Sequence, residues 1–230
     1  MATIAAPFAE PTHQDRFFSN MAVAMAVVVV IGFSTQLLMG RSTFASPLPV
    51  HAHAVLFMGW VAIFVTQAQL ATRGPIALHR RLGWLALGWI VAMVVAAMVV
   101  IVAMTRNGTV PFFFQPQHFL FADPLTLAGF VALTALAVIK RRQTDWHARL
   151  HIGAMALLTG PAFGRLLPMP LLIPYAFEAA GLATTVFLFV GMARDWKRAR
   201  AMIGAMRCGA RPNWSIAATC WLKAMVRASR

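Results

Sequence analysis

Acidic residues are scarce in this sequence: its 230 residues include only six Asp and Glu, together with one Tyr and two Cys. Charged residues of both signs make up 11% of the chain, whereas soluble globular domains carry about 25%. With 60% hydrophobic residues and a mean hydropathy of +0.72, this composition excludes an ordinary soluble domain. The patterns GxGxxG, GxxxxGK[ST], HExxH and GxSxG are absent as well, so the sequence carries no motif of the common soluble enzymes.

Long apolar segments take the place of those motifs. Windows of about 20 apolar residues, the length that crosses ~30 Å of hydrocarbon, recur along the chain. They predict an all-α fold, a polytopic membrane bundle of six transmembrane helices, multi-pass in the bacterial inner membrane. The predicted spans are 17–39, 52–72, 82–105, 119–139, 147–166 and 172–193.

The segments outside the spans define the domain organisation. Residues 1–16 lack the basic start of a secretory signal, so we interpret them as a retained cytoplasmic tail before the 17–193 transmembrane domain. Residues 194–230 form a basic cytoplasmic tail, for which an interfacial amphipathic helix and a disordered segment are both open interpretations. Cys208 and Cys220 lie in this tail without CxxC spacing, which predicts reduced thiols and no zinc site.

The basic residues predict the orientation. With the N-terminus in the cytoplasm, 17 of the 20 Lys and Arg face the cytoplasm, and only Arg41, Arg106 and Arg165 face the other side. Both termini are then cytoplasmic. A formal net charge of +14 would point to nucleic acid in a soluble protein. In a membrane protein it is explained by orientation and by attraction to anionic lipid, so we expect the bilayer as a partner and no nucleic acid.

A short sequence motif is repeated at two of the cytoplasmic turns. HRRLGW (79–84) precedes the third span, and HARLHIG (147–153) begins the fifth. Both place His-x-Arg-Leu at the cytoplasmic start of an outward-running helix. The central four helices, about 51–166, are therefore predicted to be two related hairpins, 51–105 and 113–166.

Ionisable residues inside the spans are candidate functional residues, because burying a charge in a bilayer is costly. Counting ~1.5 Å per residue from the cytoplasmic helix ends places several polar residues in one outer layer. On the second span, His53, Trp60 and Gln67 are seven residues apart and share one helix face, which predicts that they line the bundle interior. The outer polar layer contains His53, His118, Asp123, Arg165 and Glu178.

Each of these residues also has a structural explanation. Asp123 precedes Pro124, a common start of a helix, which would leave 111–121 as an interfacial or re-entrant segment. Arg165 can extend to the outer headgroups. Glu178 is surrounded by apolar residues, so we expect it to pair with a cation, and Arg165 is the first candidate.

An inner layer of histidines lies near the cytoplasmic helix ends. It contains His79 on the third span and His147 and His151, which are four residues apart and share a face of the fifth span. A b-type haem needs two axial imidazoles from opposed helices at one depth. The pairs His53 with His118, and His79 with His147 or His151, meet that requirement on sequence grounds. The structural alternative places His79 and His147 among the basic residues at the headgroups.

These features resemble the transmembrane ascorbate-reducible dihaem cytochromes b, in which helices two and four supply one ligand pair and helices three and five the other. The resemblance covers about 51–166 and includes HAVLFMGWVAIFVTQAQL, although the residue after His53 is Ala where the family has Pro. The pattern His-Ala-x-x-Phe…Trp…Gln, His-Arg-Arg-Leu-Gly and His-x-Arg-Leu is closer to a group of bacterial six-span membrane proteins without an assigned activity. The resemblance implies up to two haem b groups and electron transfer, with quinone or another membrane subunit as partner.

Two other functions fit the same sequence. One is a non-redox binding or transport protein whose site is the outer layer of His53, Asp123, Arg165 and Glu178. The other is an accessory subunit of a larger membrane complex, suggested by many Gly and Ala residues that permit close helix packing.

Overall fold

A computed structural model describes residues 13–41 and 44–207, and all the regular secondary structure in this part of the chain is helical. The described residues divide at Leu188 into two compact units, and each is considered by itself. The elements of the first unit are α1 (His13–Leu38), α2 (Leu48–Arg73), α3 (Ile76–Arg106), η1 (His118–Ala122), α4 (Asp123–Ile139), α5 (Thr144–Leu158), α6 (Gly160–Leu166), η2 (Met169–Leu172) and α7 (Ala176–Thr184), and α8 (Val186–Arg207) crosses into the second.

Five helical segments are long and apolar enough to cross a membrane, which confirms the all-α, multi-span character of the chain. They are Arg16–Leu38, Leu48–Arg73, Ile76–Arg106, His118–Ile139 and Ala176–Arg200. Each overlaps a predicted span and differs from it mainly at its ends. The largest differences are at the end of the last segment, which reaches seven residues beyond the predicted position, and at the start of α3, which begins six residues before it because 76–81 already forms its first turns.

The predicted span 147–166 is not one helix in the structure. It consists of α5 and α6, separated at the buried residue Thr159. Pro161 in the first turn of α6 has no N–H to donate to the preceding turn. The Thr159 hydroxyl donates to the Ala156 carbonyl at 2.6 Å, which satisfies one of the acceptors left at the end of α5. The two helices together cover 144–166, the length of one crossing.

The segment before α4 is helical. Residues His118–Ala122 form a π-helical turn that leads directly into α4, and α4 begins with Asp123 followed by Pro124. The alternative that Asp123 is the N-cap at which this helix starts is wrong, because the backbone is already α-helical at Ala122 and Asp123 and the π turn continues into α4. That alternative left 111–121 as an interfacial or re-entrant segment, whereas residues 118–121 belong to the helical segment that begins at His118.

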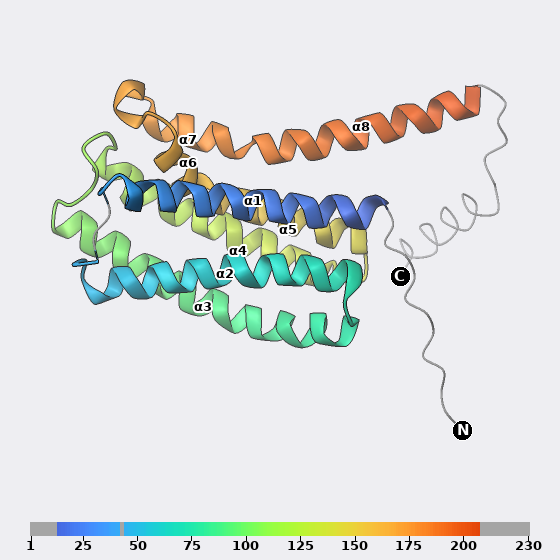
Figure 1. The fold of residues 1–230 in the computed structure, drawn as a ribbon, viewed down its shortest axis with the longest axis horizontal. Helices are drawn as coiled ribbons and strands as arrows, with labels where there is room; N and C mark the ends of the chain where they lie inside the picture. Colours follow the sequence, from blue (N-terminus) through green and yellow to red (C-terminus); the bar gives the residue numbers. More distant parts are fainter. Residues whose placement is uncertain (1–12, 42–43, 208–230) are drawn as a thin grey trace. The chain divides into compact units, whose positions relative to one another are not determined.

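Two antiparallel hairpins form the centre of the first unit, α2 with α3 and α4 with α5 (Figure 1). Contacts within each hairpin are extensive, whereas close backbone approaches between the two hairpins are few in the described residues. α1 packs against α2, α5 and α6. The predicted pairing of the central four helices as two hairpins is thus present in the structure.

Small residues allow the closest helix contacts. A Cβ atom added to Gly32 of α1 would lie 2.8 Å from the Ala162 carbonyl oxygen of α6, so only glycine permits this backbone approach. A Cβ atom on Gly59 of α2 would collide with the Trp89 ring of α3. That ring is fixed by its indole N–H, which donates to the Leu56 carbonyl at 2.8 Å.

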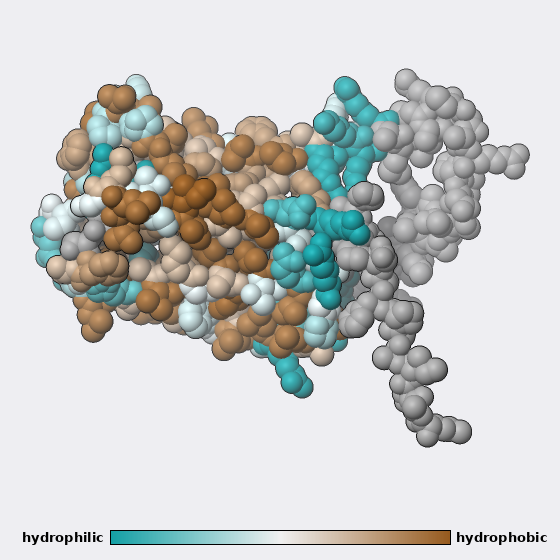
Figure 2. Space-filling model, viewed as in Figure 1, coloured by the Kyte–Doolittle hydropathy of each residue, from teal (hydrophilic) through white to brown (hydrophobic). Residues whose placement is uncertain are grey.

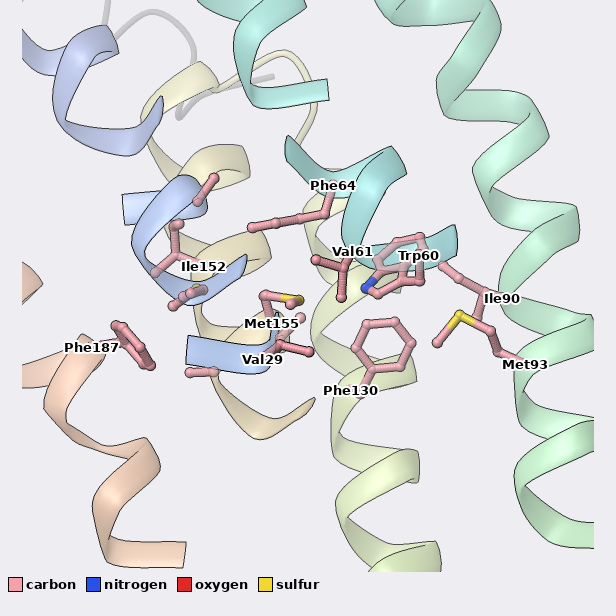
Figure 3. Packing of buried hydrophobic residues seen from close by; sticks show 14 of the residues in the cluster. Val29, Trp60, Val61, Phe64, Ile90, Met93, Phe130, Ile152, Met155 and Phe187 are labelled. Atoms are coloured by element: carbon pink, nitrogen blue, oxygen red, sulfur yellow. The ribbon is translucent and has the colours of Figure 1, made fainter. Parts of the chain in front are cut away.

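The core lies between the hairpins and α1. Trp60 of α2 meets Phe130 of α4 edge to face, with ring centroids 5.3 Å apart, and Ile90 and Met93 of α3 lie beside them (Figure 3). On the surface, apolar side chains cover the sides of the helices, and hydrophilic residues gather at the end of the bundle where α2 passes into α3 and α4 into α5 (Figure 2). Exposed basic residues at that end are Arg73, Arg80, Arg81, Lys140, Arg141 and Arg142. We call it the basic end.

Candidate functional site

Two histidines at the basic end are held in the same way. The His79 ring N–H at Nδ1 donates to the Gln67 carbonyl at 3.2 Å, and the His147 ring N–H at Nδ1 donates to the Ala137 carbonyl at 2.8 Å. In each hairpin, then, a histidine in the first turn of the second helix is tied to the last turns of the first helix. The repeated His-x-Arg-Leu motif therefore corresponds to a repeated local structure.

These hydrogen bonds determine which ring nitrogen is available. With Nδ1 donating its hydrogen, neutral imidazole presents the Nε2 lone pair as its free acceptor. Histidines that bind metals usually donate their second nitrogen to a carbonyl or carboxylate in this way, which fixes the tautomer and the ring orientation. The two carbonyl bonds therefore give His79 and His147 the same tautomer, with Nε2 as the free nitrogen of each.

The two rings approach each other across the hairpins. The centroids of His79 and His147 are 6.3 Å apart, with an angle of 79° between the ring planes. Two imidazoles on opposite sides of one metal ion have centroids about 6 Å apart, because each metal–nitrogen bond is about 2.0 Å long. The observed centroid separation of 6.3 Å is of this size.

His151 adds a third imidazole one turn deeper. Its ring meets that of His147 edge to face at 4.6 Å, which confirms that the two share a helix face. The three rings follow one another and do not surround a common point. Accordingly, no group of three or more His, Cys, Asp or Glu side chains in the described residues is arranged to hold a metal ion directly.

Polar atoms without partners lie immediately deeper than the His79–His147 pair. The Gln67 amide lies against Gly83, one turn beyond His79, and its Oε1 is buried with no hydrogen bond. Thr134 lies one turn before Ala137, and its Oγ1 is buried with no hydrogen bond. Still deeper, Nε1 of Trp60 is buried and unpartnered. We call His79, His147, His151, Gln67 and Thr134 the inner polar site.

Thr134 is the residue of this site that sequence reasoning missed. It stands in the apolar segment ALTALAVI, where threonine usually satisfies its hydroxyl on the carbonyl four residues earlier. One signal was present: Thr134 lies six residues before Lys140, just as Gln67 lies six before Arg73. Extending the comparison of the two hairpins to the helices that precede the histidines would have identified Thr134.

The outer histidines are held differently. The His53 ring packs on Phe57 with centroids 4.2 Å apart, and the His118 ring packs on Phe177 at 4.7 Å. Nδ1 of each is buried without a hydrogen-bond partner. The structure shows no ring contact between His53 and His118 in the described residues. This pair therefore lacks the carbonyl anchors that orient His79 and His147.

The charged residues of the outer layer do not form a cluster. The Arg165 guanidinium donates to the Pro161 carbonyl at 2.7 Å and lies 4.1 Å from the centroid of the Phe33 ring. Glu178 is exposed in the first turn of α7, and no ion pair joins it to Arg165 in the described part of the chain. Asp123 is half-buried at the start of α4. The predicted pairing of Glu178 with Arg165 is therefore not seen in the described residues, and the contacts of Arg165 are with its own helix and with Phe33 of α1.

Two further features of α2 complete the comparison. His51 donates a ring N–H to the Phe44 carbonyl at 3.1 Å, away from the interior stripe of α2. That stripe of His53, Trp60 and Gln67 is confirmed as inward-facing, because each of the three has a buried polar atom. The predictions for Cys208, Cys220 and the end of the basic tail lie outside the described residues.

Comparison of the chain with protein-family models, with curated proteins and with solved structures gave no match. The interpretation of the site therefore depends on its own geometry.

Proposed function

We propose that this integral membrane protein binds one b-type haem through His79 and His147 and transfers electrons. The observation that supports the proposal is the pair of Nδ1 hydrogen bonds to the Gln67 and Ala137 carbonyls, which leave two Nε2 lone pairs on rings 6.3 Å apart. Bound there, the haem iron would supply a one-electron carrier. His79 and His147 would hold it, and the two carbonyls would keep the rings in the ligating orientation.

The spacing of the helices is compatible with this assignment. A flat macrocycle between two hairpins requires that their backbones stay apart, and close backbone approaches between α2–α3 and α4–α5 are few. The exposed arginines Arg80 and Arg81 at the same end provide cations for the haem carboxylates. We do not extend the proposal to the outer pair, because His53 and His118 lack carbonyl anchors.

The membrane setting is part of the same proposal. We place the basic end in the cytoplasm of a bacterium, since Lys and Arg are concentrated on the cytoplasmic side of membrane proteins. In this arrangement α5 and α6 together make a sixth crossing, and both termini lie in the cytoplasm. A quinone or a neighbouring membrane subunit is the expected redox partner.

Visible absorption tests the haem assignment. Protein purified in detergent from haem-replete cells should show a Soret band and, after reduction with dithionite, an α-band. Quantification of extracted haem should give one group per chain. Substitution of His79→Ala or His147→Ala should abolish the bands, whereas His51→Ala should retain them, because His51 lies at the other end of α2. A colourless wild-type preparation overturns the proposal, and two haems per chain would show that the outer pair also binds.

A binding protein built on the outer layer remains the second candidate. Its expected Arg165–Glu178 pair is not seen, and Glu178 is exposed, so fewer observations support it than support the inner site.

A further inference from the structure

Three polar atoms of the protein interior have no protein partner, and they lie in one direction from the inner histidines. They are Thr134 Oγ1, Gln67 Oε1 and Trp60 Nε1. Thr134 is 3% exposed and Trp60 is 4% exposed, so neither reaches solvent at the surface of the bundle. They come from opposite hairpins, Trp60 and Gln67 from α2 and Thr134 from α4.

Leaving such groups dry is unfavourable. A buried hydroxyl or amide without a hydrogen bond costs about 1–3 kcal/mol in proteins, and hydrocarbon offers no alternative partner. Buried water normally occupies such places, where it makes two to four hydrogen bonds to polar atoms that would otherwise be unpaired. The three atoms also have complementary chemistry, because Gln67 Oε1 accepts, Trp60 Nε1–H donates and the Thr134 hydroxyl does both.

Water can enter the bundle at the basic end, where the inner histidines are half-buried. His79, His147 and His151 are each partly exposed at the basic end, while the deeper Trp60 and Thr134 are fully buried. Polar side chains thus continue from the basic end to Trp60, where Phe130, Ile90 and Met93 close the interior with apolar packing (Figure 3). Above Trp60, the next polar residue of the stripe is His53, seven residues away.

We propose that water fills a narrow vestibule between the two hairpins, which opens at the basic end, passes His151 and ends at Trp60. The vestibule hydrates Gln67 and Thr134 and makes the inner half of the bundle accessible to water and small polar solutes from one side. This inference depends on the unpartnered atoms and not on the haem assignment, so the two can fail separately.

Cysteine accessibility tests the vestibule. In a Cys208→Ser, Cys220→Ser background, Thr134→Cys should react with a charged, membrane-impermeant methanethiosulfonate, because water allows the thiol to ionise. Ala135→Cys is the matched control: its position is the next residue at nearly the same depth, but it is exposed on the outside of the bundle, where lipid keeps the thiol protonated. We expect Thr134→Cys to be modified at least tenfold faster, and only from the side of the basic end. Equal, slow modification of both variants overturns the proposal.

The unfolding temperature of a second variant, Thr134→Val, tests the vestibule independently. In a dry interior, Thr134→Val would remove an unsatisfied hydroxyl and raise the unfolding temperature. In a hydrated vestibule the hydroxyl is satisfied, so the same substitution should lower the unfolding temperature relative to the exposed control Thr66→Val. A clear increase contradicts the vestibule even if Thr134→Cys fails to fold. Colourless protein that still labels at Thr134→Cys would retain the vestibule and overturn only the haem proposal.

Discussion

At the scale of single residues, the histidines differ in what holds Nδ1. His79 and His147 donate Nδ1–H to carbonyls of the preceding helix, whereas Nδ1 of His53 and His118 is buried without a partner. A carbonyl anchor fixes both the tautomer and the direction of Nε2, so it prepares a ring for ligation. The structural role of the anchor and the ligand role of Nε2 can be separated by substitution.

The His147 anchor leads to a prediction. An Asn side chain can place an amide N–H near the Nδ1 position, so His147→Asn should keep the bond to the Ala137 carbonyl. Loss of bound haem lowers the stability of both variants relative to the wild type, so they are compared with each other. His147→Leu should be less stable than His147→Asn by about 0.5–1.5 kcal/mol, the usual net contribution of one hydrogen bond. Both variants lose Nε2 and should lack haem absorption. Denaturant unfolding and an absorption spectrum of each variant check the two effects. Haem bands retained in His147→Asn would exclude His147 as a ligand.

The outer charges give a second prediction at this scale. Because Arg165 interacts with the Pro161 carbonyl and the Phe33 ring, Arg165→Met should destabilise the protein, while the exposed Glu178→Gln should have little effect. The two effects should add to within about 0.5 kcal/mol, as expected for residues without contact. A double-mutant cycle from unfolding midpoints measures this, and a coupling of 1 kcal/mol or more would restore the ion pair that the sequence suggested.

At the scale of elements, the tightest contact between α2 and α3 depends on one glycine. Gly59→Ala puts a methyl group into the Trp89 ring, whose indole is bonded to Leu56, so α2 and α3 must move apart or Trp89 must leave its position. Overpacking of this kind costs about 1–3 kcal/mol. Gly88→Ala on α3 is the control, since a Cβ atom there meets nothing within 4 Å. Thermal unfolding in detergent should show a clear loss for Gly59→Ala and no loss for Gly88→Ala.

Most of the helical elements could be predicted from the sequence, because a bilayer requires apolar segments of fixed length and five helical segments are long and apolar enough to cross it. The break at Thr159 was harder to predict, since apolar composition does not register a missing N–H at Pro161. The inner site was predicted in part: helical spacing identified His147 with His151 and the Gln67 stripe. The sequence paired His79 with His147 or His151 and left that choice open. The approach of His79 to His147 and the role of Thr134 depend on how two hairpins face each other, which helical spacing within one segment does not determine.

At the scale of the whole molecule, the number of crossings determines which loops share a side of the membrane. The segments 44–47 and 107–117 precede α2 and follow α3, so they lie at the end opposite the basic end. The open question is the segment after α6, because α5 and α6 are separate helices that span 144–166 only in combination. Arg165 near the end of α6 contacts Phe33 near the end of α1, and the Gln36 side chain of α1 donates to the Arg165 carbonyl at 3.1 Å, so α6 ends beside the end of α1.

Reporter fusions can count the crossings. If α5 and α6 together cross, fusions at 110 and at 170 should report the same compartment, and fusions at 75 and at 142 the opposite one. With the basic end in the cytoplasm, alkaline phosphatase should be active at 110 and 170, and green fluorescent protein should fluoresce at 75 and 142. A fusion at 170 that behaves like that at 142 would mean five crossings, with α5 and α6 returning to the side where α5 began. That result would also place Arg165 at the basic end, contrary to its contacts with α1, so the reporter at 170 tests the packing of α6 as well as the topology.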